Sequence, residues 1–432
     1  MPSVALYTLG CKVSQYETEA VAEAFEARGF TLVAPTEPAD VYVINTCTVT
    51  AESDRKSRQM IRRLRSRNPN AAVAVLGCYS QRAPEELIAV GADLVLGTDN
   101  KLSVVDHVAS VLSGGERGRS YVTPLDGACF EKMKITRAPR TRAYVKIEDG
   151  CEAKCSYCAI SMARGPVRSK AREDVIDEVK RLAEGGSREI VLTGIETGSY
   201  GRDLGGGYGL ADLILELDSL GYAERIRLGS LAPELVGPDF SSKIAAARTL
   251  APHFHLSVQS GSDAVLRAMR RRYTSRTALD NIEALRAAVP GAAFTTDLMV
   301  GFPGETEEDF LLTVDFVRKA RFIACHVFAY SKREGTPAAA YGGQVLEAEK
   351  RRRSRELIRV AAEVRDGVLD GLVSSGRALE CILETYDGRG YTAHTGEFAE
   401  AYIVAEAGLL GERVYAKPIS HSGGVILAEL AR

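Results

Sequence analysis

The sequence predicts an α/β protein in three parts: an N-terminal open parallel sheet covered by helices, a central partial (βα)6 TIM-like barrel, and a C-terminal small antiparallel β-barrel. Apolar strand-like segments alternate with amphipathic helical segments over most of the 432 residues, as they do in parallel sheets. A Ser/Gly-rich stretch at 113–118 interrupts this alternation, which then resumes with longer units. The last roughly 60 residues carry only short alternating segments between glycines, a texture typical of small barrels.

The first part, residues 1–118, is expected to form the open sheet. Its predicted strands are Val4–Leu9, Val41–Thr46, Ala71–Leu76 and a short segment around Val95. Its predicted helices are Gln15–Arg28, Glu52–Arg67 and Pro84–Val90. Gly29 and Asn68-Pro69 follow the first two helices, where helix-ending residues are expected. Because strands and helices alternate, the strands should run parallel, with helices covering the sheet.

The second part, residues 135–368, repeats the pattern on a larger scale. Its predicted strands are Ala143–Glu148, Glu189–Leu192, Arg225–Leu228, Phe254–Val258, Phe294–Met299 and Ile323–Ala329. Six strand–helix units suit a partial, open version of the eight-stranded barrel, in which chemistry lies at the C-terminal ends of the strands. A highly charged helix, expected from residue 345 to about 366, ends this part.

The third part, residues 371–432, is expected to be the small barrel. Its predicted strands are Leu379–Glu384, Gly390–Thr395, Ala401–Ala405, Arg413–Ala416 and Val425–Leu430. This part holds five Lys/Arg and eight Asp/Glu residues, a net charge of −3. Its charge therefore gives no electrostatic indication of nucleic-acid binding.

The composition is that of an ordinary globular protein, with 45% hydrophobic and 26% charged residues. No apolar run approaches the length of a membrane span. The N-terminus lacks the basic start and cleavage site of a signal peptide, so we expect a cytoplasmic protein with reduced cysteines. The net charge of −2 means that any RNA binding must come from local basic patches.

Three cysteines, Cys151, Cys155 and Cys158, form a CxxxCxxC pattern directly after the first predicted strand of the second part. Thiolates are the ligands of iron–sulfur clusters, and this spacing suits three corners of a [4Fe-4S] cube. The fourth iron would then be open to a substrate or cofactor. The alternatives are a zinc site, a disulfide network and chance cysteines on a loop. Zinc usually needs four ligands, and a disulfide network does not suit a long chain without a signal peptide.

Cys11, Cys47 and Cys78 lie far apart in the sequence, yet each follows a predicted strand of the first part. The C-terminal edge of an open parallel sheet is where ligands bind, so these three thiols are expected to converge on a second metal site. The alternative is that they are small buried thiols that fill a core. The remaining cysteines, Cys129, Cys325 and Cys381, show no such arrangement, and we interpret them as structural.

Further short motifs accompany the two sets of cysteines. They are Thr8-Leu9-Gly10-Cys11-Lys12, Asn45-Thr46-Cys47-Thr48-Val49, Gly77-Cys78-Tyr79-Ser80-Gln81, Arg164-Gly165-Pro166-Val167-Arg168-Ser169, Leu192-Thr193-Gly194-Ile195-Glu196, Gln259-Ser260-Gly261-Ser262, Gly301-Phe302-Pro303-Gly304-Glu305-Thr306 and Tyr330-Ser331-Lys332-Arg333. With these motifs the chain resembles, over essentially its full length, the methylthiotransferases of the radical S-adenosylmethionine (SAM) superfamily. The resemblance implies a methylthiotransferase domain, a radical SAM core and a TRAM domain, which is a small RNA-binding barrel.

The resemblance also implies two [4Fe-4S] clusters and SAM as cofactors. Cys151, Cys155 and Cys158 would hold the cluster that binds SAM, and Cys11, Cys47 and Cys78 would hold an auxiliary cluster that presents the inserted sulfur. A second SAM would supply the methyl group. The expected partners are a tRNA substrate, a low-potential electron donor of the flavodoxin or ferredoxin kind, and a sulfur source, with no membrane.

Within the family, Leu9-Gly10-Cys11-Lys12 followed by Gln15-Tyr16-Glu17 looks most like the branch that acts on threonylcarbamoyladenosine. That nucleoside lies at position 37 of tRNA, next to the anticodon, and is methylthiolated at C2. Two alternatives within the family are a tRNA isopentenyladenosine substrate and an aspartate of a ribosomal protein. An electron-transfer iron–sulfur protein is a third alternative, although a pure carrier normally ligates all four irons.

Seven residues are candidates for the SAM site. Tyr157 matches the aromatic residue that lines the adenine site in the family. Thr193, Gly194 and Glu196 end the second predicted strand, where a carboxylate could accept the amino group of the methionine moiety. Polar side chains at or near later strand ends complete the set. They are Ser230, Gln259 and Asp297.

Basic residues near the cysteines are candidates for RNA contact, because phosphates favour such surfaces. Arg55, Arg58 and Arg62 lie in the predicted helix that follows Cys47, and Arg164 and Arg168 follow the CxxxCxxC pattern. The alternative interpretation of each is a solvated charged face.

Overall fold

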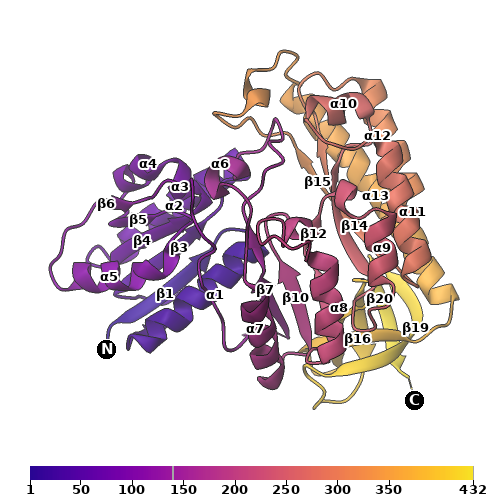
Figure 1. Ribbon diagram of the computed structural model, residues 1–432, viewed down its shortest axis with the longest axis horizontal. Helices are drawn as coiled ribbons and strands as arrows, with labels where there is room; N and C mark the ends of the chain where they lie inside the picture. Colours follow the sequence, from indigo (N-terminus) through magenta and orange to yellow (C-terminus); the bar gives the residue numbers. More distant parts are fainter. Residues whose placement is uncertain (139–140, 432) are drawn as a thin grey trace.

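The computed structural model describes residues 1–138 and 141–431. The predicted sequence ranges 135–368 and 371–432 include residues 139–140 and 432, which lie outside the described part. The chain forms three assemblies in sequence order, an N-terminal sheet, a central barrel-like sheet and a closed C-terminal barrel (Figure 1). The predicted α/β fold class is confirmed.

The N-terminal sheet has six parallel strands in the order β2-β1-β3-β4-β5-β6. The strands are β1 (Ser3–Thr8), β2 (Thr31–Leu32), β3 (Val41–Thr46), β4 (Ala72–Gly77), β5 (Leu94–Leu96) and β6 (Arg119–Tyr121). Strands β3 and β4 are buried at every residue, as expected for parallel strands covered on both faces. Strand β6 extends the sheet beyond residue 118, the predicted end of the first part.

Helices cover both faces of this sheet. They are α1 (Lys12–Ala27), α2 (Ala51–Arg67), α3 (Cys78–Arg82), α4 (Pro84–Ala89), the 3-10 turn η1 (Lys101–Ser103) and α5 (Val104–Leu112). One core cluster joins Val21 and Phe25 of α1 to Val108 of α5, and another contains Ile61 and Leu64 of α2. Alternate residues of β3 contribute to the two clusters, so α1 and α5 lie on one face and α2 on the other.

The central assembly contains six main parallel strands, with a short strand β12 before the fourth. They are β7 (Arg142–Lys146), β10 (Glu189–Thr193), β11 (Arg225–Leu228), β12 (Ser230–Leu231), β13 (His253–Gln259), β14 (Ala293–Val300) and β15 (Ala324–Ala329). They pair as β11-β10-β7 and β12-β13-β14-β15, and a parallel bridge between Ile226 and Leu250 connects the two groups. Within the described residues β7 and β15 do not pair, so the barrel is open between them.

Helices surround the central strands. They are α7 (Arg172–Glu184), α8 (Leu210–Leu220), α9 (Pro238–Ile244), α10 (Asp263–Ala268), α11 (Ser275–Ala288) and α12 (Glu307–Ala320). The short helix α6 (Ile160–Arg164) lies between β8 (Glu148–Asp149) and β9 (Arg168–Ser169), which pair antiparallel at the top of the first strand. Three further 3-10 turns, η2 (Thr197–Ser199), η3 (Pro233–Leu235) and η4 (Pro337–Ala340), follow strands.

The N-terminal sheet packs against the open side of the central barrel. Helix α1 lies beside β7, and Tyr16 of α1 belongs to the core cluster of the central barrel. The buried Arg333, after β15, donates to Thr48 Oγ1 at 2.7 Å and to Asp54 Oδ2 at 2.5 Å. The start of α2 is therefore fixed against the loop that follows β15.

The long helix α13 (Glu347–Ser374) leads into a closed barrel in the order β16-β17-β18-β20-β19. Its strands are β16 (Leu379–Tyr386), β17 (Gly390–Thr395), β18 (Glu400–Val404), β19 (Arg413–Ser422) and β20 (Val425–Leu430). The barrel was predicted to be antiparallel, and every pair is antiparallel except β18–β20, which is parallel. Helix α13 continues beyond the predicted end, through Gly367 and Gly371, because Leu369 packs into the core of this barrel.

The C-terminal barrel contacts residues of the central strands from below the sheet in the view of Figure 1. Arg227 donates to the backbone oxygens of Thr395 and Gly396, and its guanidinium pairs with Glu189 at 2.9 Å. The ring of Phe398 stacks on His253, with 4.6 Å between the ring centroids. The C-terminal barrel thus covers the end of the central barrel opposite to the cysteines of the CxxxCxxC pattern. Among the described residues, no helix is both long and apolar enough to cross a membrane.

Candidate active site

A cavity of about 530 Å³ lies at the C-terminal ends of the central strands, within the size range of small-molecule sites. The loop after β8, the turn after β10, strands β13 to β15 and the start of α2 all contribute to its wall. The lining residues are Val49, Thr50, Ser53, Cys151, Ala153, Cys155, Tyr157, Cys158, Ala159, Ile160, Ile195, Glu196, Ser257, Gln259, Arg271, Asp297, Met299, His326, Phe328, Ala329, Tyr330 and Ser331.

The CxxxCxxC loop is held in place by backbone contacts. Gly150, just before the first cysteine, has a φ of +91°, and a Cβ there would lie 1.8 Å from the backbone oxygen of Pro166. The position therefore requires glycine. The backbone N–H of Cys151 donates to Gly165 at 3.0 Å, and that of Ser156 donates to Met269 at 3.0 Å. The three thiols are presented by a loop that the surrounding chain fixes on both sides.

The three thiols lie near one another. Besides burial, the charges of the neighbouring Cys155 and Cys158 raise the pKa of Cys151. Burial raises the pKa of Cys151 to about 12 and that of Cys158 to about 11. Hydrogen-bond donors nevertheless face the sulfurs: the Arg271 guanidinium lies 3.3 Å from Cys155 Sγ, and the Ile160 N–H lies 3.4 Å from Cys158 Sγ. These donors suit thiolates, the form that iron binding produces.

Three thiols on one loop are the ligand type that iron–sulfur clusters take. Among the described residues, no three His, Cys, Asp or Glu side chains gather around one point as a mononuclear site requires. A [4Fe-4S] cluster instead takes one thiolate at each of its irons, so its ligands are more widely spaced. Cys151, Cys155 and Cys158 all line the cavity and supply three thiols of this kind.

Four of the seven sequence-predicted cofactor residues line the cavity: Tyr157, Glu196, Gln259 and Asp297. The Glu196 carboxylate accepts the N–H of Ala232 at 3.0 Å, and burial raises its pKa to about 7. Gln259 has a φ of +69°, and its buried Oε1 has no hydrogen-bond partner. A strained, buried polar side chain with an unpartnered oxygen at a cavity wall is typical of a ligand-binding position.

The other three predicted cofactor residues lie outside the lining. Thr193 is the last residue of β10, where it pairs with Lys146 of β7. Gly194 packs against the side chain of Glu148, and a Cβ there would lie 2.5 Å from Glu148 Oε2. Ser230 begins β12 and pairs with His255 of β13. These residues shape the strand ends beside the cavity without lining it.

Several lining residues were not predicted from the sequence. Arg271 lies in a run of three arginines, is half-buried, and donates to Cys155 Sγ and to the backbone oxygen of Ser257. His326 and Phe328 lie two residues apart on β15 and line the same cavity. The period-two alternation of a strand beside a cysteine site was the signal that would have identified them.

Cys11, Cys47 and Cys78 come together at the C-terminal edge of the N-terminal sheet. Cys11 is the N-cap residue of α1, Cys47 directly follows β3, and Cys78 begins α3 directly after β4. The three thiols lie near one another: besides burial, the charges of Cys11 and Cys47 raise the pKa of Cys78. Gly77, with a φ of +104°, makes the turn that places Cys78 at this edge. The convergence expected from their strand-end positions is present.

Donors also face these sulfurs. The N–H of Val49 lies 3.5 Å from Cys47 Sγ, and the Arg164 Nε–H lies 3.1 Å from Cys78 Sγ. Cys11 is exposed, Cys47 is half-buried and Cys78 is buried. The three thiols and their donors suit a second cluster by the same criteria as the first.

Arg164 and Arg168 were predicted to contact RNA, and the structure contradicts both assignments. Arg164 is fully buried, and Arg168 is 5% exposed. The Arg168 guanidinium donates to the backbone oxygen of Arg164 at 2.8 Å. Neither side chain can present its charge to a phosphate at the surface, because α6 and β9 fold back beneath the CxxxCxxC loop.

Arg164 instead belongs to a buried ionic cluster between the N-terminal sheet and the central barrel. Its guanidinium bonds Glu17 at 2.5 Å and Asp149 at 3.1 Å. Lys101 and Lys146 also pair with Glu17, at 3.2 and 2.9 Å. These cations hold the pKa of both carboxyls below its ordinary value. Each carboxylate is thus paired, as buried charges must be.

Replacing Arg164 with methionine should destabilise the fold by about 3–5 kcal/mol, because Glu17 and Asp149 would remain buried with fewer partners. The urea midpoint of unfolding, followed by circular dichroism, measures the effect. Arg172→Met is the matched control, since Arg172 is half-exposed and pairs with Glu216 at the surface. Equal midpoints for the two variants would contradict a structural role for the ionic cluster.

The predicted RNA contacts on α2 remain accessible. Arg55 is exposed and pairs with Glu52, and Arg62 is exposed. Arg58 is less exposed, since its guanidinium donates to the Tyr79 hydroxyl and pairs with Glu86 at 3.5 Å. Because α2 begins at the cavity wall, its exposed cations extend away from the site along the surface.

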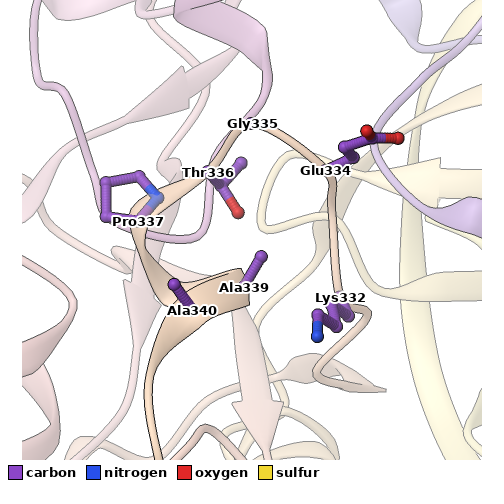
Figure 2. A pocket seen from close by; sticks show the side chains of 7 residues that line it. All are labelled: Lys332, Glu334, Gly335, Thr336, Pro337, Ala339 and Ala340. Atoms are coloured by element: carbon purple, nitrogen blue, oxygen red, sulfur yellow. The ribbon is translucent and has the colours of Figure 1, made fainter.

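A second hollow of about 760 Å³ lies along the loop after β15 (Figure 2). Its lining residues are Lys332, Glu334, Gly335, Thr336, Pro337, Ala339 and Ala340. Its lining comes from this one segment, which turns from Lys332 through Gly335 to Ala340. Arg82 of α3 donates to the backbone oxygen of Glu334 at 2.6 Å, so the segment also touches the N-terminal sheet. The hollow contains no cysteine and no convergent polar groups, and it is not the better candidate for chemistry.

Two family models match the chain. Residues 145–317 match the radical SAM superfamily, and residues 3–97 match the uncharacterized protein family UPF0004. The first match covers the CxxxCxxC loop and most of the central barrel, and the second covers Cys11, Cys47 and Cys78.

Curated relatives extend the similarity over almost the whole chain. The threonylcarbamoyladenosine tRNA methylthiotransferase MtaB of Bacillus subtilis is 37% identical, covering 96% of this chain and 94% of the relative. The protein of the same name from Thermotoga maritima is 40% identical, covering 84% and 83%. The tRNA-2-methylthio-N(6)-dimethylallyladenosine synthase of Carboxydothermus hydrogenoformans is 36% identical, covering 85% and 84%.

Solved structures show the same fold at low sequence identity. The radical S-adenosylmethionine methyltransferase TsrM of Kitasatospora setae, with cobalamin and a [4Fe-4S] cluster bound, has a TM-score of 0.57 at 17% identity over 78% of this chain and 77% of that chain. The cobalamin-dependent S-adenosylmethionine radical enzyme OxsB has a TM-score of 0.54 at 12% identity, covering 83% and 56%.

Proposed function

The chain belongs to the methylthiotransferase family of radical SAM enzymes, and we propose that it inserts a methylthio group at C2 of N6-threonylcarbamoyladenosine at position 37 of tRNA. The main support for the proposal is the set of residues that line two sides of the cavity. The CxxxCxxC loop forms one side, and Val49, Thr50 and Ser53, which closely follow Cys47, form another. The segment that begins two residues after Cys47 therefore borders the same space as the CxxxCxxC loop, and a single base would be held there.

The target is an unactivated aromatic C–H bond, which ordinary acid–base chemistry does not functionalise. Cys151, Cys155 and Cys158 would hold a [4Fe-4S] cluster, which together with SAM would supply the radical chemistry that such a bond requires. The chain's own residues bind and orient the cofactor. Tyr157, Gln259 and Glu196 line the cavity. The Tyr157 ring and the Gln259 amide would contact SAM, and the Glu196 carboxylate would accept its amino group.

The second cluster is part of the proposal. Cys11, Cys47 and Cys78 would hold it at the sheet edge, from which the inserted sulfur would be presented, and a second SAM would supply the methyl group. Apolar side chains of the cavity, including Val49, Ile195, Met299 and Phe328, would exclude water from the reactive intermediates. A low-potential flavodoxin- or ferredoxin-like protein and a separate sulfur source complete the expected partners, in the cytoplasm.

Exposed cations on α2, including Arg55 and Arg62, would contact phosphates of the anticodon arm, since α2 begins at the cavity. We also propose that the C-terminal barrel is a TRAM domain. Tyr415, which is 54% exposed, would offer a ring on which an RNA base can stack. The net charge of this barrel gives no electrostatic attraction for RNA.

Cells that lack the gene for this chain should lose 2-methylthio-threonylcarbamoyladenosine from their tRNA and accumulate the unmethylthiolated nucleoside. Quantitative nucleoside mass spectrometry of purified tRNA measures both. 2-Methylthio-isopentenyladenosine in the same digest is the internal control and should be unchanged. Loss of that nucleoside instead would contradict the substrate, and unchanged levels of both would contradict the reaction.

A further inference from the structure

His326 is a polar residue of the cavity to which the proposed reaction gives no role. It lies on β15, the edge strand that faces the open side of the central barrel, and it lines the cavity. Its side chain is 75% exposed. Phe328, two residues further along the strand, lines the same cavity, so the imidazole and the phenyl ring share one face of β15.

The imidazole of His326 is oriented by Asp297. Nδ1 of His326 lies 3.2 Å from Asp297 Oδ1, while Nε2 of His255 lies 3.3 Å from Oδ2 of the same carboxylate. His255 is held in turn by Thr295 Oγ1 at 2.9 Å. A carboxylate beside Nδ1 fixes the ring and favours the imidazolium, and the pKa of His326 is raised accordingly. The Nε2–H of that imidazolium is then available to the cavity.

Other charges of the cavity are already engaged. Of the described lining residues, Glu196 and Asp297 are acidic and Arg271 is the other cation. The Arg271 guanidinium is committed to Cys155 Sγ, the Ser257 backbone oxygen and the Tyr273 hydroxyl. Lys12 of α1 contributes positive charge near Asp297, although burial lowers its pKa. Among the described cations that line the cavity, the His326 imidazolium is therefore the one that still offers a donor to an incoming anion.

The N6 substituents of the candidate nucleosides differ in charge, and an imidazolium binds a negatively charged group. A threonylcarbamoyl group ends in a carboxylate, whereas an isopentenyl group is a hydrocarbon. Placing a carboxylate against the cavity wall without a partner is unfavourable, because the wall removes part of its hydration. Pairing it with an imidazolium offsets that penalty through a charge-assisted hydrogen bond.

We propose that His326 binds the carboxylate of the threonylcarbamoyl group and so selects this nucleoside over one with a hydrocarbon substituent. The inference rests on the proposed function, whose substrate it explains. Asp297 acts as the positioning residue for the imidazole, and Phe328 packs beside it. The carboxylate of SAM is the other anion that His326 could bind, and SAM cleavage without tRNA distinguishes it from the carboxylate of the threonylcarbamoyl group.

The test compares two anticodon stem-loops that differ at one group: threonylcarbamoyladenosine, and its carboxamide, in which the carboxylate is replaced by a neutral amide. The reconstituted wild-type enzyme should methylthiolate the acid with a kcat/KM at least about tenfold above that for the amide, as expected for one charge-assisted hydrogen bond. His326→Gln should lower kcat/KM for the acid by about 10- to 100-fold and remove the preference.

His421→Gln is the matched control. His421 Nε2 lies 2.9 Å from Asp370 Oδ1, an equivalent histidine–aspartate pair in the contact between the C-terminal barrel and α13, and the wild-type acid/amide ratio should persist in this variant. Equal losses on acid and amide in His326→Gln would assign the residue a structural role and overturn the inference. Unchanged kcat/KM values for both stem-loops in that variant would overturn the inference as well.

Formation of 5′-deoxyadenosine in the absence of tRNA provides the second readout. Loss of this activity in His326→Gln would assign His326 to SAM and overturn the inference. A wild-type enzyme that cleaves SAM but leaves the threonylcarbamoyl stem-loop unmodified would overturn the proposed function, and with it the role of His326. These outcomes are distinguishable because the first appears only in the variant.

Discussion

Replacing Cys155 with alanine should abolish SAM cleavage and methylthiolation together, each by at least about 1,000-fold, which corresponds to about 4 kcal/mol in activation free energy. Cys155 is 8% exposed and accepts a hydrogen bond from Arg271, so its thiolate is the most enclosed of the three. Two remaining thiolates cannot hold a cube that keeps one iron open to SAM. The measurements are 5′-deoxyadenosine formation with a chemical reductant and tRNA nucleoside analysis.

Iron content gives an independent measurement on the same variant. If the chain holds two [4Fe-4S] clusters, iron per chain should fall from about eight to about four. Cys129→Ala is the matched control, since Cys129 is exposed on a loop and lies in neither set of cysteines. Continued SAM cleavage by Cys155→Ala would mean that SAM does not bind at this loop.

The buried elements of the fold were the most predictable. Strand β3 was predicted to the residue, because its sequence Val-Tyr-Val-Ile-Asn-Thr is a continuous apolar run between breaks. The short edge strands β2 and β6 were missed, since two or three residues carry no detectable period. Helix α5 was missed because it is rich in valine, which has a low helix propensity, and packing of Val104, Val108 and Val111 stabilises it instead.

The cysteines could be predicted for a different reason. Cys151, Cys155 and Cys158 are close in sequence, so their spacing alone indicates a cluster loop. Cys11, Cys47 and Cys78 are distant in sequence, but each follows a strand, and parallel strands end at one edge. In both cases a local pattern determined the three-dimensional position.

The charged residues of the site could not be placed in this way. Arg164 looks like a surface cation in the sequence, and its burial depends on Glu17, which lies 147 residues away. The partners of Arg271 and His326, namely Cys155 and Asp297, are 116 and 29 residues away. The Arg164–Glu17 pair forms only when the N-terminal sheet packs against the central barrel, and the other two pairs form only when the central barrel itself assembles. No local pattern contains that information.

Replacing Cys47 with alanine should separate the two activities that the Cys155 substitution abolishes together. SAM cleavage should stay within about tenfold of wild type, while methylthiolation should fall by at least about 1,000-fold. The physical reason is that separate contacts hold the two sets of cysteines. The CxxxCxxC loop is fixed by Gly150, Met269 and Arg271, and none of these residues has a hydrogen bond to Cys47.

The two cysteine variants are most informative as a pair assayed in one reaction mixture. Both should lose about half of the iron, so a difference in iron content does not explain a difference in activity. Cys47→Ala should form 5′-deoxyadenosine without methylthiolated tRNA, whereas Cys155→Ala should form neither. Sulfur insertion by Cys47→Ala, or by the triple replacement of Cys11, Cys47 and Cys78, would show that this sheet edge does not supply the sulfur. Because Val49, Thr50 and Ser53 line the cavity shortly after Cys47 in the sequence, the uncoupled result would support a sulfur donor on the side of the cavity that they form.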